Sequence, residues 1–317
     1  MRKRILRVGA FLALLLVLLQ TAGLLFQPKN NDYYAGMREL SANGILGEPD
    51  NTIDAVFLGD SEAYCAFIPL EIWEKTGIPS YVCGVVDQHF YQTPEYLRRC
   101  FQAQNPKVVV LETNVLYRGY PGKGMISYLG ELLFPVTRYH DRWKKLRGSD
   151  WFRLPEYTEV TPEKGYHHRL EAVPADTEEY MIPTEDLEPI SGMNLGILRY
   201  MASYCRRQGA QLVLVSSPST QNWDYRRHNA VAAAAEKLGL PYVDMNCMGE
   251  QIPIDWNTDT LDAGDHMNYY GASKVSDYMA DFLVNTGLFS DKRTLPEYAA
   301  WNAFAEEFAA GLPKTGP

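Results

Sequence analysis

The stretch from Val56 to Tyr64, VFLGDSEAY, decides how this sequence is interpreted. An apolar run ends abruptly at Gly59, Asp60 and Ser61, which is typical of a buried strand that reaches the edge of a sheet. The serine can be a simple turn residue, or it can be a nucleophile held at the strand end. A serine hydroxyl becomes an effective nucleophile at neutral pH only beside a base, so the choice depends on the rest of the chain.

Strand and helix patterns alternate along the chain around this stretch. Short apolar runs predict strands at 53–58, 80–83, 107–111, 211–215 and 242–245, and amphipathic segments predict helices at 69–75, 94–103, 193–207, 225–238 and 270–283. Almost wholly apolar strands that alternate with helices indicate a parallel sheet covered on both faces. The expected order is β-α-β-α-β, an insertion, then α-β-α-β, a loop and a closing helix.

Residues 1–27 predict a cytoplasmic basic stub followed by a transmembrane signal anchor. Four basic residues among the first seven precede an apolar stretch from Val8 to Phe26, which is about long enough to span a bilayer. The basic end is expected to stay in the cytoplasm. A cleaved signal peptide is the alternative, because residues 21–23 could form a processing site, but the apolar run continues past them. We therefore expect a single-pass anchor in the cell membrane and an extracytoplasmic domain.

The remaining chain divides into three parts, the second of which carries an insertion. Residues 28–50, rich in Asn, Gly and Pro, predict a linker with one short helical piece, and 51–290 predict the folded domain. Residues from about 117 to 189 break the alternation and are expected to form an insertion that serves as a lid or substrate wall over one end of the sheet. Residues 291–317 are expected to be a C-terminal tail. The aromatic residues of the insertion could stack on sugar rings or pack a small subdomain: Tyr117, Tyr120, Tyr128, Tyr139, Trp143 and Trp151.

Charge and cysteine content exclude several classes of protein. Without the first 26 residues, which hold four basic and no acidic side chains, the chain keeps 26 basic and 39 acidic ones, a net charge of −13. This surface disfavours nucleic acid as a partner and suits a neutral or cationic one. The five cysteines have no CxxC spacing and are odd in number, so neither a zinc site nor a complete disulfide framework is indicated. We expect mostly buried free thiols, with one unassigned disulfide left open, and no metal or cofactor.

Candidate site residues follow the predicted strands. Ligands of an open parallel sheet meet the carboxyl ends of its strands, where Ser61, Gly84 and Asn114 follow the first three strands. His266, in the loop LDAGDHMNYYGASK before the closing helix, is the best-placed base for Ser61. Two residues of the segment DQHFYQ, after the second strand, are candidate substrate contacts: Gln88 and His89.

Together these segments resemble the SGNH/GDSL hydrolase superfamily. Its nucleophile block is similar to FLGDSEAY, with Ser61, and its last block is similar to DAGDHMN, with the base His266. Its glycine and asparagine blocks match Gly84 in VCGVVDQ and Asn114 in VLETN. The resemblance spans about residues 53–301 apart from the insertion. The segments DHMNYYGASKVSDYMADFL and SDKRTLPEYAAW further resemble membrane-anchored, extracytoplasmic members from Gram-positive bacteria.

The resemblance implies a flavodoxin-like three-layer α/β/α domain behind one transmembrane helix. It also implies an acyl-serine intermediate on Ser61, with His266 as base and an oxyanion hole made by Ser61, Gly84 and Asn114. An acid that holds the histidine usually stands three residues before it in the family, where this chain has alanine. Two acids compete for that role: Asp262, four residues before the histidine and preferred, and Asp265, adjacent to it, which could instead cap the closing helix.

The activity that the resemblance implies is that of a serine esterase or O-acyltransferase, with acetyl as the expected acyl group and cell-envelope carbohydrate as the expected target. Relatives similar to alginate-acetylation and teichoic-acid D-alanylation proteins work with a membrane-bound O-acyltransferase. The expected partners are therefore an acylated carbohydrate or acyl donor, together with such an acyltransferase. A non-catalytic accessory subunit, which binds polysaccharide or docks the acyltransferase, is the alternative. A lipid esterase would need an apolar insertion, and the many charged residues of this insertion disfavour it.

Overall fold

The computed structural model describes residues 1–119 and 122–312. Its five strands form one parallel sheet in the order β2-β1-β3-β4-β5. Every strand lies within two residues of a predicted one, and the α/β fold class with a parallel central sheet is confirmed. The strands are β1 (Ala55–Gly59), β2 (Ser80–Gly84), β3 (Val108–Glu112), β4 (Gln211–Ser216) and β5 (Tyr242–Asp244).

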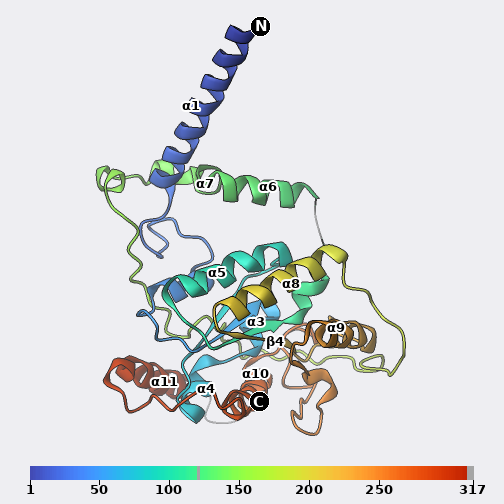
Figure 1. Cartoon of the computed structure of the whole chain (residues 1–317). Helices are drawn as coiled ribbons and strands as arrows, with labels where there is room; N and C mark the ends of the chain where they lie inside the picture. The colour runs from blue at the N-terminus through green and yellow to red at the C-terminus, as the bar shows by residue number, and fades with distance from the viewer. Residues whose placement is uncertain (120–121, 313–317) are drawn as a thin grey trace.

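Helices cover both faces of this sheet (Figure 1). Alternate residues of β1 face opposite layers, because successive side chains of a strand point to opposite sides. Val56 and Leu58 pack with α5 and α8, whereas Phe57 packs with α3 and α10. The five predicted helices are all present, with the bounds α4 (Pro69–Thr76), α5 (Thr93–Ala103), α8 (Gly192–Arg207), α9 (Tyr225–Leu238) and α10 (Tyr269–Asn285). A short helix that was not predicted, α3 (Ser61–Ala66), directly follows β1.

The strand order places a topological switch between β1 and β3. The chain leaves β1 to form β2 on one side and then crosses back to form β3 on the other side. Gly59 pairs with Gly84 of β2, and Leu58 pairs with Leu111 of β3. Ligands of doubly wound sheets bind in the crevice at such a switch point. The segments that follow these three strands therefore start side by side.

Both ends of the domain are more ordered than a linker and a tail. Residues 28–50 contain α2 (Leu40–Asn43) and η1 (Gly44–Gly47), and Ile45 is buried in the main core. Residues 291–312 contain η7 (Pro296–Tyr298) and α11 (Ala299–Gly311), which packs on α4. A buried ion pair of 2.8 Å joins Glu48 to Lys164, whose Nζ lies 4.6 Å from the ring centre of Trp301 in α11. Through these two contacts, Lys164 of the insertion ties both ends of the domain together.

The insertion divides into two parts with different positions. Its first part holds α6 (Gly122–Leu133), α7 (Pro135–Arg138), η4 (His140–Lys144) and η5 (Gly148–Trp151), and it lies at the end of α1 (Arg2–Phe26) (Figure 1). Its second part returns along the domain, where the His167 N–H donates to the Tyr64 carbonyl at 2.9 Å and the Val173 N–H donates to the Thr260 carbonyl at 3.1 Å. This second part and the start of the insertion, where Arg118 Nε donates to Asp60 Oδ2 at 2.7 Å, lie near the carboxyl end of the sheet, where a lid or wall was expected. Tyr120 lies outside the described residues.

The helix α1 matches the predicted apolar segment. It is long and apolar enough to cross a bilayer by length and composition, with a mean hydropathy of 2.3, and 6% of its apolar window is buried. Figure 1 shows α1 projecting away from the α/β domain.

Candidate active site

Ser61 is the first residue of α3, directly after the turn that ends β1. The turn is tight, because a Cβ at Gly59 would lie 2.8 Å from the Ala63 Cβ and 2.9 Å from the Glu112 Cβ, so only glycine fits there. Asp60 caps α3 by accepting the Glu62 N–H on Oδ1 at 3.1 Å. Ser61 is 6% exposed. The local sequence therefore holds Ser61 at the carboxyl end of β1, beside the topological switch point.

The end of β2 lies against this turn. A Cβ at Gly84 would lie 2.8 Å from the carbonyl oxygen of Asp60 and 3.1 Å from the Tyr64 side chain. Real Cβ atoms do not approach backbone oxygens so closely, so a side chain at position 84 would force the strands apart. The structure thus brings Gly84 next to the residue that precedes Ser61, as a shared oxyanion hole requires.

Asn114 lies beside the same turn through its contact with Asp60. Its Nδ2 donates to Asp60 Oδ2 at 3.1 Å, and Arg118 Nε donates to the same oxygen at 2.7 Å. Burial raises the pKa of Asp60, and the Arg118 guanidinium opposes that shift. An amide nitrogen carries two hydrogens, so Asn114 keeps a second N–H that could donate to an oxyanion.

His266 is held by Asp262. The imidazole Nδ1 lies 2.8 Å from Asp262 Oδ2, and the His266 backbone N–H donates to Asp262 Oδ1 at 2.7 Å. Since Nδ1 faces a carboxylate, the assigned proton is on Nδ1, and Nε2 is left with a free lone pair. This is the tautomer that a general base for a serine requires.

Asp265 has a different set of contacts. Its Oδ2 lies 3.7 Å from Nδ1 of His266, and its Oδ1 accepts from Asn222 Nδ2. It does not cap α10 either, because Asn268 does so by accepting the Tyr270 and Gly271 N–H groups. Of the two candidate acids, the structure therefore brings Asp262 into hydrogen-bond contact with the imidazole.

The loop before α10 accommodates the four-residue spacing between acid and base. Ala263 and Gly264 both have positive φ angles, +58° and +91°. The His266 carbonyl accepts from the Leu261 N–H at 2.9 Å, which closes the loop around these two residues. The extra residue is absorbed in this left-handed turn, so Asp262 still reaches the imidazole.

Glu62 and Glu112 are buried acids at the site that the sequence did not reveal as such. Glu62 is 1% exposed, its Oε1 accepts from Asn222 at 2.6 Å, and its Oε2 has no hydrogen-bond partner among the described residues. Burial, followed by the charges of Glu112 and Asp60, raises the pKa of Glu62 well above its usual value. Burial, followed by Asp60, raises the pKa of Glu112 to about 8. The only sequence signal was a charged residue directly after Ser61.

The base faces this buried acid. A ring nitrogen of His266, an oxygen of Glu62 and an oxygen of Asp265 all lie within 4.8 Å of one another. Nε2 of His266 is buried and has no hydrogen-bond partner within residues 1–119 and 122–312, so no hydrogen bond joins it to Ser61. Catalytic hydrogen bonds of substrate-free sites are often long and tighten only when substrate binds. The structure therefore places the base beside the helical turn of Ser61 without completing the proton path.

The two candidate substrate contacts follow the end of β2, where their side chains make local contacts. Gln88 is buried, and its Nε2 donates to Thr93 Oγ1 at 2.7 Å at the start of α5. His89 stacks on Tyr91, with ring centres 5.4 Å apart. Neither residue lines a described cavity next to the site, and the contacts of Gln88 serve the start of a helix.

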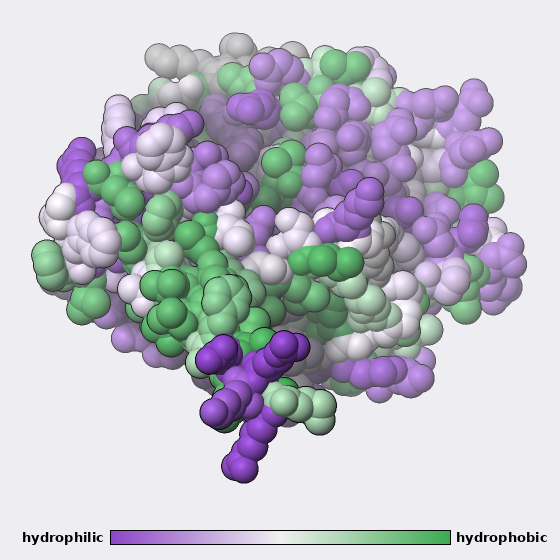
Figure 2. All heavy atoms as spheres, turned by 90° about the horizontal axis from the view of Figure 1, so that it is seen from above, coloured by the Kyte–Doolittle hydropathy of each residue, from purple (hydrophilic) through white to green (hydrophobic). Residues whose placement is uncertain are grey.

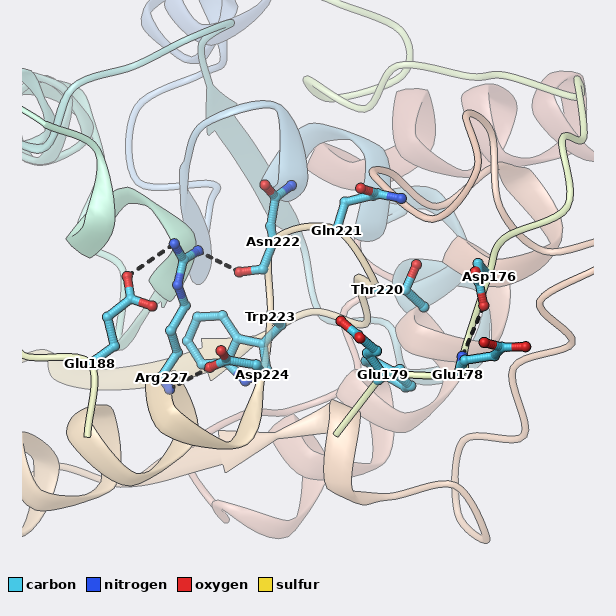
Figure 3. Close-up of a pocket in the computed structure, with 11 residues that line it drawn as sticks. Asp176, Glu178, Glu179, Glu188, Thr220, Gln221, Asn222, Trp223, Asp224 and Arg227 are labelled. Carbon is cyan, nitrogen blue, oxygen red and sulfur yellow. Dashed lines mark hydrogen bonds and ion pairs between the residues drawn. The ribbon is translucent and has the colours of Figure 1, made fainter. Parts of the chain in front are cut away.

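A cavity of about 460 Å³ opens next to the site. Asn222, which bonds both Glu62 and Asp265, forms part of its wall (Figure 3). Arg227, the one basic residue among the described lining residues, is held by Glu188 at 3.1 Å and by the Asn222 carbonyl at 2.5 Å. Five acidic residues line the cavity: Asp176, Glu178, Glu179, Glu188 and Asp224. A mostly acidic lining attracts ligands of positive charge, so this cavity favours a neutral or cationic group.

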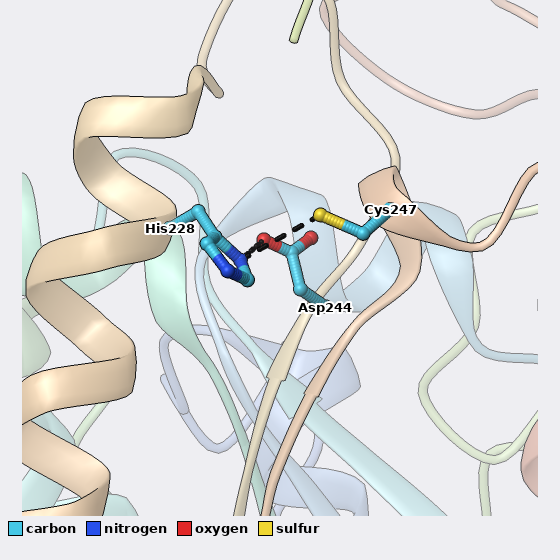
Figure 4. Close-up of side chains that lie close together, drawn as sticks. All are labelled: His228, Asp244 and Cys247. Atoms are coloured by element: carbon cyan, nitrogen blue, oxygen red, sulfur yellow. Dashed lines mark hydrogen bonds and ion pairs between the residues drawn. The ribbon is translucent and has the colours of Figure 1, made fainter. Parts of the chain in front are cut away.

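A second cluster of His, Asp and Cys lies beside β5 (Figure 4). Asp244 Oδ2 accepts from His228 Nδ1 at 2.7 Å, from Trp223 Nε1 at 2.9 Å and from the Tyr242 hydroxyl at 3.0 Å. Burial and the Asp244 charge raise the pKa of the Cys247 thiol to about 12, so that thiol stays protonated. These groups satisfy one another, and we interpret the cluster as structural. All five cysteines are free, and the other four are buried.

Comparisons with known proteins find similarity only to distantly related solved structures. No family model matches the chain, and no curated protein matches it. Solved structures similar to it include an acylhydrolase-type protein from Bacteroides fragilis, at 14% identity over 80% of this chain and 98% of that one, with a TM-score of 0.41. Others are an acetyl xylan esterase, AlAXEase (13% identity, 73% and 100% covered, TM-score 0.40), and a GDSL-like lipase from Bacteroides thetaiotaomicron (13%, 74% and 88%, 0.37). Likeness at this level carries no argument about function.

Proposed function

We propose that this chain is a membrane-anchored serine esterase or O-acyltransferase of the SGNH type, acting outside the cytoplasm on acyl groups of carbohydrate. The observation that carries the proposal is the orientation of His266. Asp262 occupies its Nδ1 at 2.8 Å, which leaves Nε2 as a free base beside the turn of Ser61. A free Nε2 is what a general base for a serine requires, and a ring nitrogen of His266 lies within 4.8 Å of an oxygen of Glu62, the residue that follows Ser61.

In the proposed reaction, the Ser61 hydroxyl attacks the acyl carbon while His266 Nε2 takes its proton. The carboxylate of Asp262 then stabilises the imidazolium that forms. Backbone N–H groups of Ser61 and Gly84 and the second amide hydrogen of Asn114 donate to the oxyanion, and each donor of this kind contributes about 3 kcal/mol. The protonated imidazole next gives its proton to the leaving alcohol, and an acyl-serine remains.

The second half of the reaction decides between hydrolysis and transfer. Water as acceptor makes the chain an esterase, and a sugar hydroxyl makes it an acyltransferase. We place the alcohol or sugar part of the substrate in the cavity beside Asn222. This cavity adjoins the loop that carries Asp262 and His266, because Asn222 donates to Asp265 of the same loop. Acetyl is our proposed acyl group, cell-envelope carbohydrate is our proposed target, and a membrane-bound O-acyltransferase is a proposed partner.

A non-catalytic accessory subunit is the second candidate, and one observation favours it. A ring nitrogen of His266 lies within 4.8 Å of an oxygen of the acid Glu62, and among the described residues no hydrogen bond joins Nε2 to Ser61. If this arrangement persisted with substrate bound, the serine would lack its base.

A fluorophosphonate probe separates the two candidates, because it labels only an activated serine. The purified full chain should be labelled, Ser61→Ala and His266→Gln should not be, and His89→Gln should be labelled as strongly as the wild type. Ser61→Ala should also abolish hydrolysis of p-nitrophenyl acetate with an almost unchanged melting temperature. Wild-type protein that stays unlabelled and inactive while folded would exclude the esterase and favour the accessory subunit.

A further inference from the structure

We propose that residues 122–154, named the platform below, rest on the outer leaflet of the bilayer around the end of α1, so that lipid is the partner of their apolar side chains. The proposal does not depend on catalysis. It rests on the position of the platform, its exposed apolar and aromatic side chains, and its charge.

The platform is attached to the end of α1. Gln20 Nε2 donates to the Leu133 carbonyl at 2.8 Å, and α7 packs on α1. Arg142 Nη1 donates to the carbonyls of Phe26 at 2.9 Å and Gln27 at 2.6 Å, so its buried guanidinium satisfies the carbonyls that the helix end leaves unpaired. Figure 1 shows α6 and α7 crossing the end of α1 rather than running alongside it. The platform therefore lies where a membrane-spanning α1 would leave the bilayer.

The same contacts cover the sequence at which a signal peptide could be cleaved. Gly23 is buried, and a Cβ there would lie 3.2 Å from Cδ of Pro135 in the platform. Cleavage after this residue would remove the helix on which the platform packs. This packing favours an α1 that stays attached and keeps the platform at the membrane surface.

The platform exposes an unusual number of large apolar side chains. Single exposed apolar residues are ordinary on a protein surface, but a dense group marks an interaction site. Figure 2, which shows the face that carries α1, has apolar side chains gathered on it. The exposed residues of the platform are Ile126, Leu129, Leu132, Leu133, Trp143, Trp151, Phe152 and Leu154.

The kind of residue on the platform indicates lipid rather than a protein partner. Tryptophan is enriched at membrane–water interfaces, where its ring meets both the apolar core and the headgroups. Arg138 pairs with Glu95, and Arg142 and Asp150 are buried, so residues 138–153 expose four basic side chains and one acidic one. The chain beyond α1, in contrast, has a net charge of −13. Basic side chains near a membrane surface attract anionic headgroups. An apolar, aromatic and basic surface beside a spanning helix is therefore matched to an anionic bilayer.

A fluorescence experiment on the full chain in lipid nanodiscs tests the proposal. The discs contain phosphatidylglycerol, with acyl chains that are either brominated or unbrominated, since bromine quenches tryptophan only at contact. The starting variant is Trp143→Phe/Trp151→Phe, which removes the two exposed tryptophans of the platform. A new reporter is then introduced by Ile126→Trp in α6, at a side chain that is 70% exposed. The matched control is Leu187→Trp, at a side chain that is 54% exposed beside α9, which Figure 1 places away from α1.

The starting variant keeps four other tryptophans, so its fluorescence in the same discs is subtracted. We expect the remaining Ile126→Trp signal to fall by about half in brominated discs, because an interfacial helix buries its apolar face among the acyl chains. The Leu187→Trp reporter should be unchanged. Wild type should be quenched more than Trp143→Phe/Trp151→Phe. Equal fluorescence of the Ile126→Trp reporter in both kinds of disc would overturn the proposal and leave a protein partner as the remaining explanation of the exposed surface.

Discussion

Asp262 holds His266 through both of its carboxylate oxygens, one on the imidazole Nδ1 at 2.8 Å and the other on the backbone N–H at 2.7 Å. The double contact fixes the ring in place as well as its tautomer. It is possible only because the chain turns through the left-handed region at Ala263 and Gly264. An acid four residues before the histidine therefore reaches the imidazole of His266 in this chain.

Replacement of the two acids by asparagine should separate their roles. Asp262→Asn should lower kcat/KM for p-nitrophenyl acetate by about 10²- to 10⁴-fold, because the amide favours the wrong tautomer of His266. Asp265→Asn, the matched control, should cost less than about tenfold, since it lies 3.7 Å from Nδ1. Steady-state kinetics check both variants. Equal losses would contradict the assignment of Asp262 as the positioning acid.

Gly84→Ala should damage the site through its backbone. The new methyl group would meet the Asp60 carbonyl at 2.8 Å and push β2 away from the Ser61 turn. A displacement of about 1 Å can cost about 100-fold in rate, and we expect a loss of that order in kcat. Gly196→Ala in α8 is the control, because nothing lies within 4 Å of its Cβ. That variant should keep full activity and gain about 0.5–1 kcal/mol of stability, measured by urea unfolding.

Glu62 should make the protein less stable as the pH rises. Its folded-state pKa is raised by burial, whereas its unfolded-state pKa is about 4.3. The contribution of Glu62 to the free energy of unfolding is therefore fully present below its unfolded-state pKa. It is lost as the pH rises toward its folded-state pKa, because unfolding releases a proton in this pH window. Glu62→Gln cannot ionise, so its melting temperature should fall less than that of the wild type between about pH 5 and about pH 8.

The control for this prediction is Glu74→Gln, which alters an exposed acid on α4. Its melting temperature should follow the wild type over the same pH range. Parallel curves for wild type and Glu62→Gln would mean that Glu62 is already ionised in the folded protein.

The order and bounds of the strands and helices could be predicted because each is a continuous apolar or amphipathic run. The start of α9 at Tyr225 and its end at Leu238 agree with the predicted helix. The strand ends in turn bring Ser61, Gly84 and Asn114 to one switch point, so their proximity followed from topology. His266 could be identified because the loop before α10 returns to the same edge of the sheet.

The features that could not be predicted depend on contacts between distant segments, and these segments show no helical or strand periodicity in the sequence. The burial of Glu62 depends on Asn222, which lies 160 residues away and gives no signal beside Ser61. The position of the platform depends on the contact of Pro135 with Gly23, which no sequence pattern indicates, so the sequence left open whether the aromatic residues there stack on sugar rings or pack a small subdomain. Likewise, Lys164 joins Glu48 to Trp301, and this joins the supposed linker and tail to the domain.

The acidic cavity should make the proposed esterase favour esters of cationic alcohols. Acetylcholine and 3,3-dimethylbutyl acetate have the same shape and differ only in the charge of one central atom, so they isolate the electrostatic effect. Because the cavity concentrates cations, kcat/KM should be about tenfold higher for acetylcholine, and salt should reduce the difference. The double substitution Glu178→Gln/Glu179→Gln should also reduce the difference in kcat/KM between the two esters. Glu74→Gln should leave that difference unchanged, because Glu74 lies outside this cavity. Equal rates for the two esters would contradict the role of the cavity but leave Ser61 catalysis intact, and hydrolysis of neither ester would count against the esterase itself.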